Sequence, residues 1–227
     1  MHFNSWQNSQ KPNCGIRIQF ETGYTFSFKD AHPNVKTHTF PETLIRLGLT
    51  KILEWRVEWP NLTFMDNGTN VNGFRDLALG FKIQIFQQQG LRPRLSFAGR
   101  LSIPTGDEDF SSDRLDPELP TILTYALNVR VGLFGNVNIA GPTSRGKRFV
   151  QVSSSLGLSA TIRKRVSGYI EYFGLYPRDA ARGSGHFLQT GALYLLNYHM
   201  QLDARVGAGL TRGTDDMFAG AGISWRF

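Results

Sequence analysis

Cysteine is almost absent from this sequence, in which Cys14 is the only one among 227 residues. A single thiol can form neither an internal disulfide nor a cysteine-based metal site. We therefore expect no disulfide framework and no thiolate metal centre, and no other motif in the chain suggests a cofactor.

Long apolar runs are also lacking. No stretch of about 18 consecutive apolar residues occurs, so the sequence offers no transmembrane helix. The mean hydropathy of −0.25 is that of a soluble protein. A membrane β-barrel is compatible with the same value, because each of its strands shows only one face to lipid.

Acidic side chains are fewer than basic ones, which gives a formal net charge of +7. An excess of Lys and Arg can indicate nucleic-acid binding when the residues are clustered. Here they are dispersed along the chain, so we expect no nucleic-acid partner.

What the sequence does contain is a strict alternation, clearest in residues 217–227. The odd positions are Met, Ala, Ala, Ile, Trp and Phe, whereas the even ones include two glycines, Ser224 and Arg226. A period of two is that of a β-strand. The chain stops on an aromatic residue, Phe227, as strands that close a membrane barrel often do. We expect this strand to be the one that the barrel assembly machinery recognises.

Eleven further segments repeat the alternation, most of them about ten residues long. They are residues 15–28, 40–49, 53–59, 77–85, 94–103, 119–127, 130–139, 150–159, 166–176, 188–196 and 200–210. In all twelve segments the apolar face carries no Asp, Glu, Lys or Arg. Placing Lys or Arg on the lipid face at mid-membrane costs about 2–4 kcal/mol, so this exclusion indicates that the apolar face contacts lipid.

The charged residues on the opposite face have both signs and could pair across a lumen. The predicted lumen charge network is Glu21, Arg46, Glu54, Arg56, Glu58, Lys82, Arg100, Glu171, Asp203, Arg205 and Arg226. Unpaired charges inside a barrel would be costly to bury.

The connections alternate between long and short. The long ones are residues 29–38, 60–72, 104–117, 140–147, 177–186 and 212–216, and the short ones are 50–51, 88–90, 127–128, 163–165 and 197–199. Membrane barrels keep short turns on the periplasmic side. This pattern predicts an even number of strands and places both termini in the periplasm.

Together these patterns predict an all-β fold, a closed up-and-down antiparallel transmembrane β-barrel of twelve strands in the outer membrane of a Gram-negative cell. The barrel domain is residues 15–227, and residues 1–14 form a periplasmic tail. Residues 1–10 lack the basic start and apolar core of a signal peptide. We expect that a leader was either removed or lies upstream in a longer reading frame.

Four stretches resemble a known family. They are PETLIRLGLTKILEWR at 41–56, GFRDLALGFK at 73–82, IPTGD at 103–107 and GYIEYFG at 168–174. With the ending at 215–227 they resemble the outer-membrane "transporter / meta-pathway of phenol degradation" family over roughly residues 18–227. The resemblance implies an outer-membrane barrel that helps hydrophobic compounds to cross the membrane.

The lumen residues suggest how such a barrel could act. Apolar side chains that point inward and could line a path for small hydrophobic or aromatic compounds are Phe134, Tyr169, Phe173, Leu193, Leu195 and Phe218. The same side chains could merely fill the interior, as in small closed barrels. The alternative function is a structural or surface-binding barrel whose outer loops contact partners.

Enzyme chemistry is weakly supported. His2, His32, His38 and His186 fall in the tail or outer loops and His199 falls in a short turn, so no histidine lies mid-strand beside a serine for lipid hydrolysis. We expect no enzyme. Asp107, Glu108 and Asp109 lack the spacing of a Ca²⁺ loop, so we expect a solvated acidic loop and no metal.

Basic residues near the outer rim are candidates for lipopolysaccharide contacts. They are Arg145, Lys147, Arg148, Arg178 and Arg182. Guanidinium and ammonium groups suit the phosphates of that lipid, although a solvated rim is the alternative.

Overall fold

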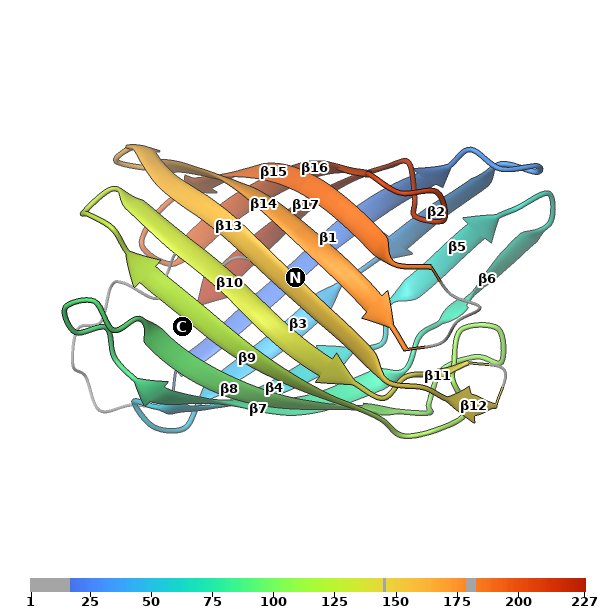
Figure 1. Ribbon diagram of the computed structural model, residues 1–227, viewed down its shortest axis with the longest axis horizontal. Coiled ribbons are helices and arrows are strands. Elements are labelled where there is room, and N and C mark those ends of the chain that lie inside the picture. Colours follow the sequence, from blue (N-terminus) through green and yellow to red (C-terminus); the bar gives the residue numbers. More distant parts are fainter. Residues whose placement is uncertain (1–16, 145, 179–182) are drawn as a thin grey trace.

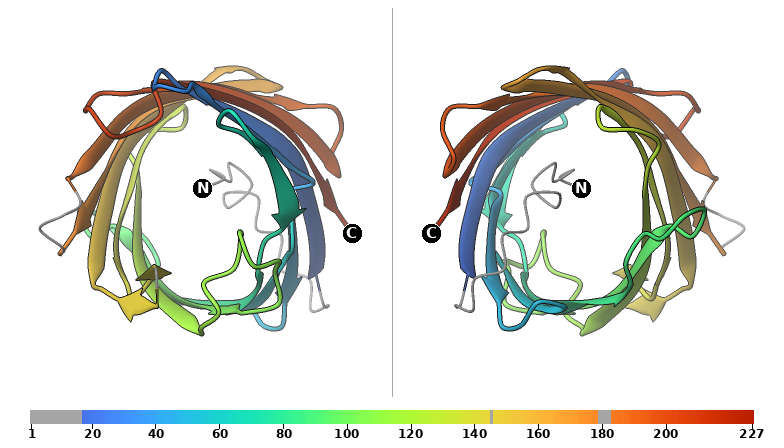
Figure 2. Two further views of the ribbon diagram at one scale, coloured as in Figure 1. Left: turned by 90° about the vertical axis from the view of Figure 1, so that its right-hand side faces the viewer. Right: turned by 90° about the vertical axis from the view of Figure 1, so that its left-hand side faces the viewer.

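The computed structural model describes residues 17–144, 146–178 and 183–227. Twelve of its strands form a closed antiparallel ring, seen from the side in Figure 1 and along its axis in Figure 2. They are β1 (Arg17–Lys29), β3 (Thr43–Gly48), β4 (Leu53–Trp59), β7 (Leu77–Phe86), β8 (Arg94–Ile103), β9 (Asp116–Ala126), β10 (Val131–Ala140), β13 (Gln151–Arg163), β14 (Val166–Pro177), β15 (Gly185–Leu195), β16 (Met200–Gly209) and β17 (Met217–Arg226). The predicted barrel of twelve strands is confirmed.

The ring closes between its first and last strands. β1 pairs with β17 from Gln19 opposite Arg226 to Phe28 opposite Met217. The Phe227 amide then donates to the Ile18 carbonyl at 2.9 Å. Lipid offers no partner for backbone groups at an open edge, so this seam is what makes the sheet compatible with a bilayer.

The register shows that the alternation predicted from the sequence holds around the ring. Residues directly opposite each other in neighbouring strands point to the same face. Phe20 lies opposite both Trp225 and Ile45, and Leu133 lies opposite both Tyr125 and Leu158. The apolar positions of successive strands therefore form one continuous surface.

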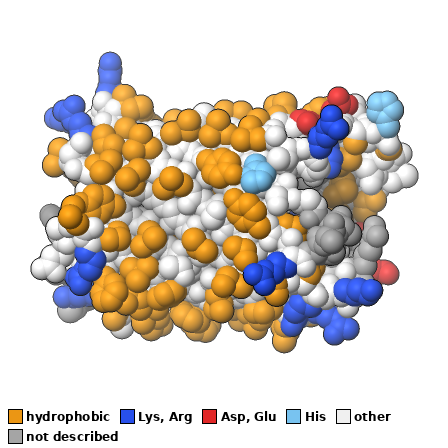
Figure 3. Space-filling view, in the orientation of Figure 1, with side chains coloured by type: hydrophobic (Ala, Val, Ile, Leu, Met, Phe, Trp, Pro, Cys, Tyr) orange, Lys and Arg blue, Asp and Glu red, His pale blue; other side chains and the backbone are white. Residues whose placement is uncertain are grey.

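That surface is the outside of the barrel. Hydrophobic side chains dominate the middle of the face shown in Figure 3, and Lys and Arg lie mainly toward its two ends. Trp55, Val137 and Leu156 are 42%, 50% and 64% exposed although each lies in the wall. Within the described residues no helix is long and apolar enough to span a membrane. Because successive side chains of a strand point to opposite faces, the charged and polar side chains point into the barrel.

Two of the predicted long connections contain strands of their own, which corrects the sequence prediction. Residues 29–38 and 60–72 contribute to β2 (Val35–Phe40), β5 (Leu62–Asp66) and β6 (Asn70–Phe74), which extend the wall at the long-loop end, on the right in Figure 1. A short hairpin, β11 (Thr143–Ser144) with β12 (Lys147–Arg148), lies in a third connection.

The length of β1 explains the first of these additions. β3 pairs only with its beginning, Arg17 to Glu21, and β2 pairs with its end, Thr25 to Lys29. Without β2 the end of β1 would keep an open edge beside the barrel. The predicted segment 40–49 is therefore a strand that starts at Thr43, after a break at Pro41, whose nitrogen has no hydrogen to donate.

The predicted tail, residues 1–14, lies outside the described residues.

Candidate functional site

Five of the inward aromatic rings form two groups. Phe134 and Tyr169 meet edge to face, with ring centroids 6.2 Å apart. Closer to the long loops, Phe173 stacks on Phe187 at 4.6 Å, and Phe218 lies 6.3 Å from both. The predicted lumen aromatics are thus brought together in two places on the β10–β17 wall.

Not every residue predicted for this path joins these groups. Leu193 and Leu195 lie at the short-turn end of β15, and Leu193 is buried. Phe187 was missed, although it shares its face with Leu193. It falls at the border between a predicted loop and strand, so the sequence did not assign it to the lumen. Ile122, which points inward from β9, was missed as well.

Three of the rings lie over glycines of a neighbouring strand. Phe134, Tyr169 and Phe218 stand directly opposite Gly157, Gly191 and Gly207. A Cβ atom added at any of these glycines would collide with the facing ring. The rings therefore lie along the wall instead of pointing to the barrel axis.

The charged residues of the lumen form ion pairs near the short turns. Arg46 lies 2.7 Å from Glu21 and 3.6 Å from Glu54, and Arg56 lies 2.7 Å from the same Glu54 oxygen. Glu21 and Arg46 are almost fully buried. These ion pairs bring four residues of the predicted network together. Lys82 faces Glu54 directly across the β4–β7 ladder.

Two more groups of ion pairs lie nearer the long loops and include acids that the sequence analysis missed. Arg100 lies 2.8 Å from Glu58 and 3.5 Å from Glu118. Arg205 lies 3.3 Å from Glu42. Glu118 falls just outside its predicted strand, which explains its omission, whereas Glu42 lies on the charged face of the predicted segment 40–49 and was not included in the predicted network.

The remaining network residues have other surroundings. Glu171 is buried and accepts a hydrogen bond of 2.6 Å from the Gln189 amide. Asp203 lies over Gly222, whose missing side chain leaves it room. Arg226 lies opposite Gln19, at the short-turn end of the seam.

Among the cavities lined by the described residues, two lie inside the barrel. The turn-side cavity, of about 280 Å³, is lined by Arg46, Lys82, Phe134 and residues of the β9–β10 turn. The loop-side cavity, of about 350 Å³, is lined by Arg205 and by the three rings of Phe173, Phe187 and Phe218. Asn136 and Glu171 line both cavities.

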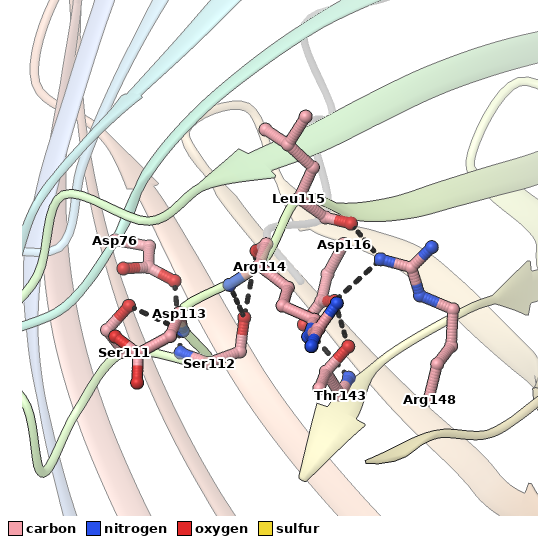
Figure 4. Close-up of polar contacts among 9 residues, drawn as sticks. All are labelled: Asp76, Ser111, Ser112, Asp113, Arg114, Leu115, Asp116, Thr143 and Arg148. Carbon is pink, nitrogen blue, oxygen red and sulfur yellow. Dashed lines mark hydrogen bonds and ion pairs between the residues drawn. The ribbon is translucent and has the colours of Figure 1, made fainter. Parts of the chain in front are cut away.

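At the long-loop end, side-chain carboxylates fix the loops. Asp76 accepts the amides of Thr105 at 3.2 Å and Gly106 at 3.0 Å, and that of Ser112 at 3.5 Å. Figure 4 shows the end of this loop between Asp76 and Thr143. These bonds order the rim where the predicted solvated acidic loop begins.

On the other side of the same loop, Arg148 bonds the Leu115 carbonyl and lies 3.5 Å from Asp116 (Figure 4). Asp116 also accepts the Thr143 amide and hydroxyl, at 3.0 and 2.8 Å. Arg148 thus has a partner within the rim. Arg145 and Arg182 lie outside the described residues.

Three histidines of the described residues form hydrogen bonds with groups other than serine. His38 Nδ1 bonds the Tyr24 hydroxyl at 2.7 Å, and His186 Nδ1 bonds the Tyr172 hydroxyl at 2.6 Å. His199 bonds the Arg226 carbonyl. Across the described ranges no group of His, Cys, Asp and Glu side chains could hold a metal ion.

A closed ring of twelve antiparallel strands with an apolar outside and a polar, charged inside defines an outer-membrane β-barrel. The sequence matches a family model described as "Putative MetA-pathway of phenol degradation" over residues 6–227, and the chain belongs to this family. This confirms the resemblance found in the sequence.

Solved structures share the fold at low sequence identity. An outer-membrane channel from Pseudomonas putida F1 is 16% identical with a TM-score of 0.72, over 97% of this chain and 98% of that one. The NanC porin is 7% identical with a TM-score of 0.61, over 93% and 99%. The translocator domain of the autotransporter NalP from Neisseria meningitidis is 10% identical with a TM-score of 0.58, over 95% and 90%. A search of curated protein sequences finds no match.

Proposed function

We propose that the barrel is a passive channel that lets small hydrophobic or aromatic compounds cross the outer membrane. The observation that carries this proposal is the arrangement of the lumen aromatics. Phe173, Phe187 and Phe218 form one side of the loop-side cavity, and Phe134 continues the apolar wall into the turn-side cavity. Apolar rings beside a cavity are typical of sites that accept apolar molecules.

The rings over glycines support a path more than a filled interior. A barrel whose rings only filled space would be expected to point them toward the axis and to leave no volume beside them. In this lumen Phe134, Tyr169 and Phe218 lie against backbone, and volume is left beside Phe134 and Phe218. The family description and the channel of similar fold are consistent with this function, and the proposal assigns the barrel no catalytic role.

Entry of a hydrophobic fluorescent probe into cells tests the proposal. Intact lipopolysaccharide excludes N-phenylnaphthylamine, so we expect cells that carry the barrel to take it up several-fold faster than cells without it. Phe187→Gln removes half of the stacked pair and should slow uptake. Leu188→Ala, on the same strand but facing lipid, is the matched control. Equal uptake with and without the barrel would refute passive uptake.

We propose the orientation of the barrel from the lengths of its loops. The short turns are proposed to face the periplasm together with both termini, and the long loops to face outward. A cysteine at Lys147, in the β11–β12 hairpin, should react with an impermeant maleimide on intact cells in a Cys14→Ser background. A cysteine at Lys164, in the β13–β14 turn, should react only after the outer membrane is opened. If Lys164→Cys reacted on intact cells and Lys147→Cys did not, the barrel would have the opposite orientation in the membrane.

The long-loop rim is then the end that meets lipopolysaccharide. Lys147 and Arg178 are exposed or partly exposed there and suit its phosphates. Replacing both with Gln should reduce the lipopolysaccharide that co-purifies with the barrel, whereas Lys164→Gln should not. If the amount of co-purified lipopolysaccharide does not change, these rim side chains contact only solvent.

The second candidate function is a surface-binding barrel, and the added strands favour it. β2, β5 and β6 build an ordered platform at the long-loop end, and Phe40 stacks on Phe64 across it at 5.6 Å. If the platform is the working part, deleting residues 62–74 should abolish binding of a partner at the cell surface and leave probe uptake intact. Loss of uptake without loss of binding would favour the channel.

A further inference from the structure

The turn-side cavity has a positively charged wall. The cations that line it are Arg46, Arg56, Lys82, Arg94 and Arg130, and the one acid among its described lining residues is Glu171. Four of these cations come from the consecutive wall strands β3, β4, β7 and β8. The loop-side cavity differs, since its lining includes Arg205 together with Glu171 and Asp215.

The ion pairs within the wall do not neutralise all of the cations that line the cavity. Glu54 stands directly opposite Lys82 in the β4–β7 ladder. Its carboxylate instead bonds Arg56 at 2.7 Å and lies 3.6 Å from Arg46. Lys82 forms no ion pair with any residue in the described part of the chain. One ammonium group on the cavity wall is therefore available to a bound anion.

The neighbouring wall of the same cavity is apolar. Ile122 on β9 and Phe134 on β10 both line it, and they lie two residue pairs apart in the β9–β10 ladder, on the same face. Pro120 lines the same wall. The cavity thus has a cationic side next to an aromatic and aliphatic side. Its volume is near the lower end of small-ligand pockets, about 300–1,000 Å³.

We propose that this cavity binds a small aromatic carboxylate during its passage. The ring would lie against Ile122 and Phe134, and the carboxylate would meet Lys82 and Arg56. A guanidinium and an ammonium together suit a carboxylate better than a neutral hydroxyl. The inference rests on the proposed channel function, because it names the class of solute that the channel selects.

Charge selectivity in planar bilayers tests the proposal with the full-length protein. Sodium benzoate and benzylammonium chloride carry aromatic ions of similar size and opposite charge. Reversal potentials under a gradient of each salt give the permeability of the organic ion relative to its counterion. For the wild-type barrel we expect benzoate to be favoured over benzylammonium by several-fold, as a cation-lined passage favours anions.

Variants at Lys82 locate the effect. Lys82→Gln should lower the preference for benzoate by about threefold to tenfold, and Lys82→Glu should reverse it. Lys51→Gln removes the same charge from the exposed β3–β4 turn, outside the cavity, and should leave the preference unchanged. The heat-dependent mobility of each variant in detergent gels shows whether it has folded.

Three results would overturn the inference. One is a wild-type barrel that prefers benzylammonium, another is a preference for benzoate that survives Lys82→Glu in a folded barrel, and the third is the absence of current from either organic ion. If neutral probe uptake by cells persists in any of these cases, the channel function stands and only its anionic solute class fails. If probe uptake fails too, the channel function fails with it.

Discussion

The side chain of Phe134 lies on the backbone of Gly157, the residue directly opposite it in the β10–β13 ladder. A Cβ atom at Gly157 would overlap the ring. Glycine is therefore required at this position by a close approach of its neighbour, and not by an unusual backbone conformation. The pair sets how far the aromatic wall reaches into the lumen.

Gly157→Ala should push the Phe134 ring away from the wall. Overpacking of this kind costs about 1–3 kcal/mol, and the displaced ring should also narrow the turn-side cavity and lower single-channel conductance. Gly132→Ala adds the same methyl group on the same face of β10, where the nearest atoms would be 3.3 and 3.5 Å away. A Gly157 variant as stable and as conductive as the Gly132 variant would contradict this packing.

Val137→Arg should destabilise the barrel in lipid. Val137 is 50% exposed on the outer face of β10, and an arginine on the lipid face near mid-membrane costs about 2–4 kcal/mol. Ser153→Arg places the same side chain beside the loop-side cavity and should cost less. Reversible urea unfolding in lipid vesicles measures both. Equal costs would mean that the outer surface does not contact hydrocarbon.

Arg205 should stabilise the seam through Glu42. Its guanidinium crosses over Gly220 of β17 to reach the Thr25 hydroxyl at 2.6 Å and Glu42 at 3.3 Å. The side chains of the ion pair are 12% and 24% exposed. In a double-mutant cycle of Arg205→Gln and Glu42→Gln, we expect a coupling of about 1 kcal/mol in the free energy of unfolding. Additive single effects would show that the contact contributes nothing to closure.

Asp76→Ala should release the loop that follows β8. Three backbone amides, those of Thr105, Gly106 and Ser112, would lose their acceptor. Trypsin should then cleave after Arg114 several-fold faster than in the parent barrel. Glu108→Ala removes an exposed carboxylate from the same loop and serves as the control. If both variants are cleaved equally fast, Asp76 does not hold this loop.

The barrel could be predicted from the sequence because lipid imposes one rule on every strand. The rule acts residue by residue, so the inward position of Phe134 or Glu171 follows from its place in the alternation alone. The number of strands follows in the same way, because each crossing of the membrane repeats the pattern.

Contacts between strands could not be predicted in this way. The meeting of Phe173, Phe187 and Phe218 depends on the register of β14 to β17, which the alternation leaves free to shift by two residues at a time. The ion pairs of Arg205 with Glu42 and of Arg100 with Glu118 depend on register too.

The added strands were missed for a different reason. β2, β5 and β6 lie in long connections that contain Pro33 and Pro60, residues that favour turns and interrupt strands. They form because the end of β1 offers unpaired backbone groups beyond the reach of β3. Such an edge appears only when the lengths of neighbouring strands are known.

Oxygen accessibility along one strand tests the division between a lipid-facing and a lumen-facing side most directly. Nitroxide labels would be placed one at a time at residues 133–138 of β10, in a Cys14→Ser background and in lipid vesicles. We predict high collision rates with oxygen at 133, 135 and 137, and low rates with more contact with a water-soluble reagent at 134, 136 and 138. The opposite phase, or no alternation at all, would contradict the account.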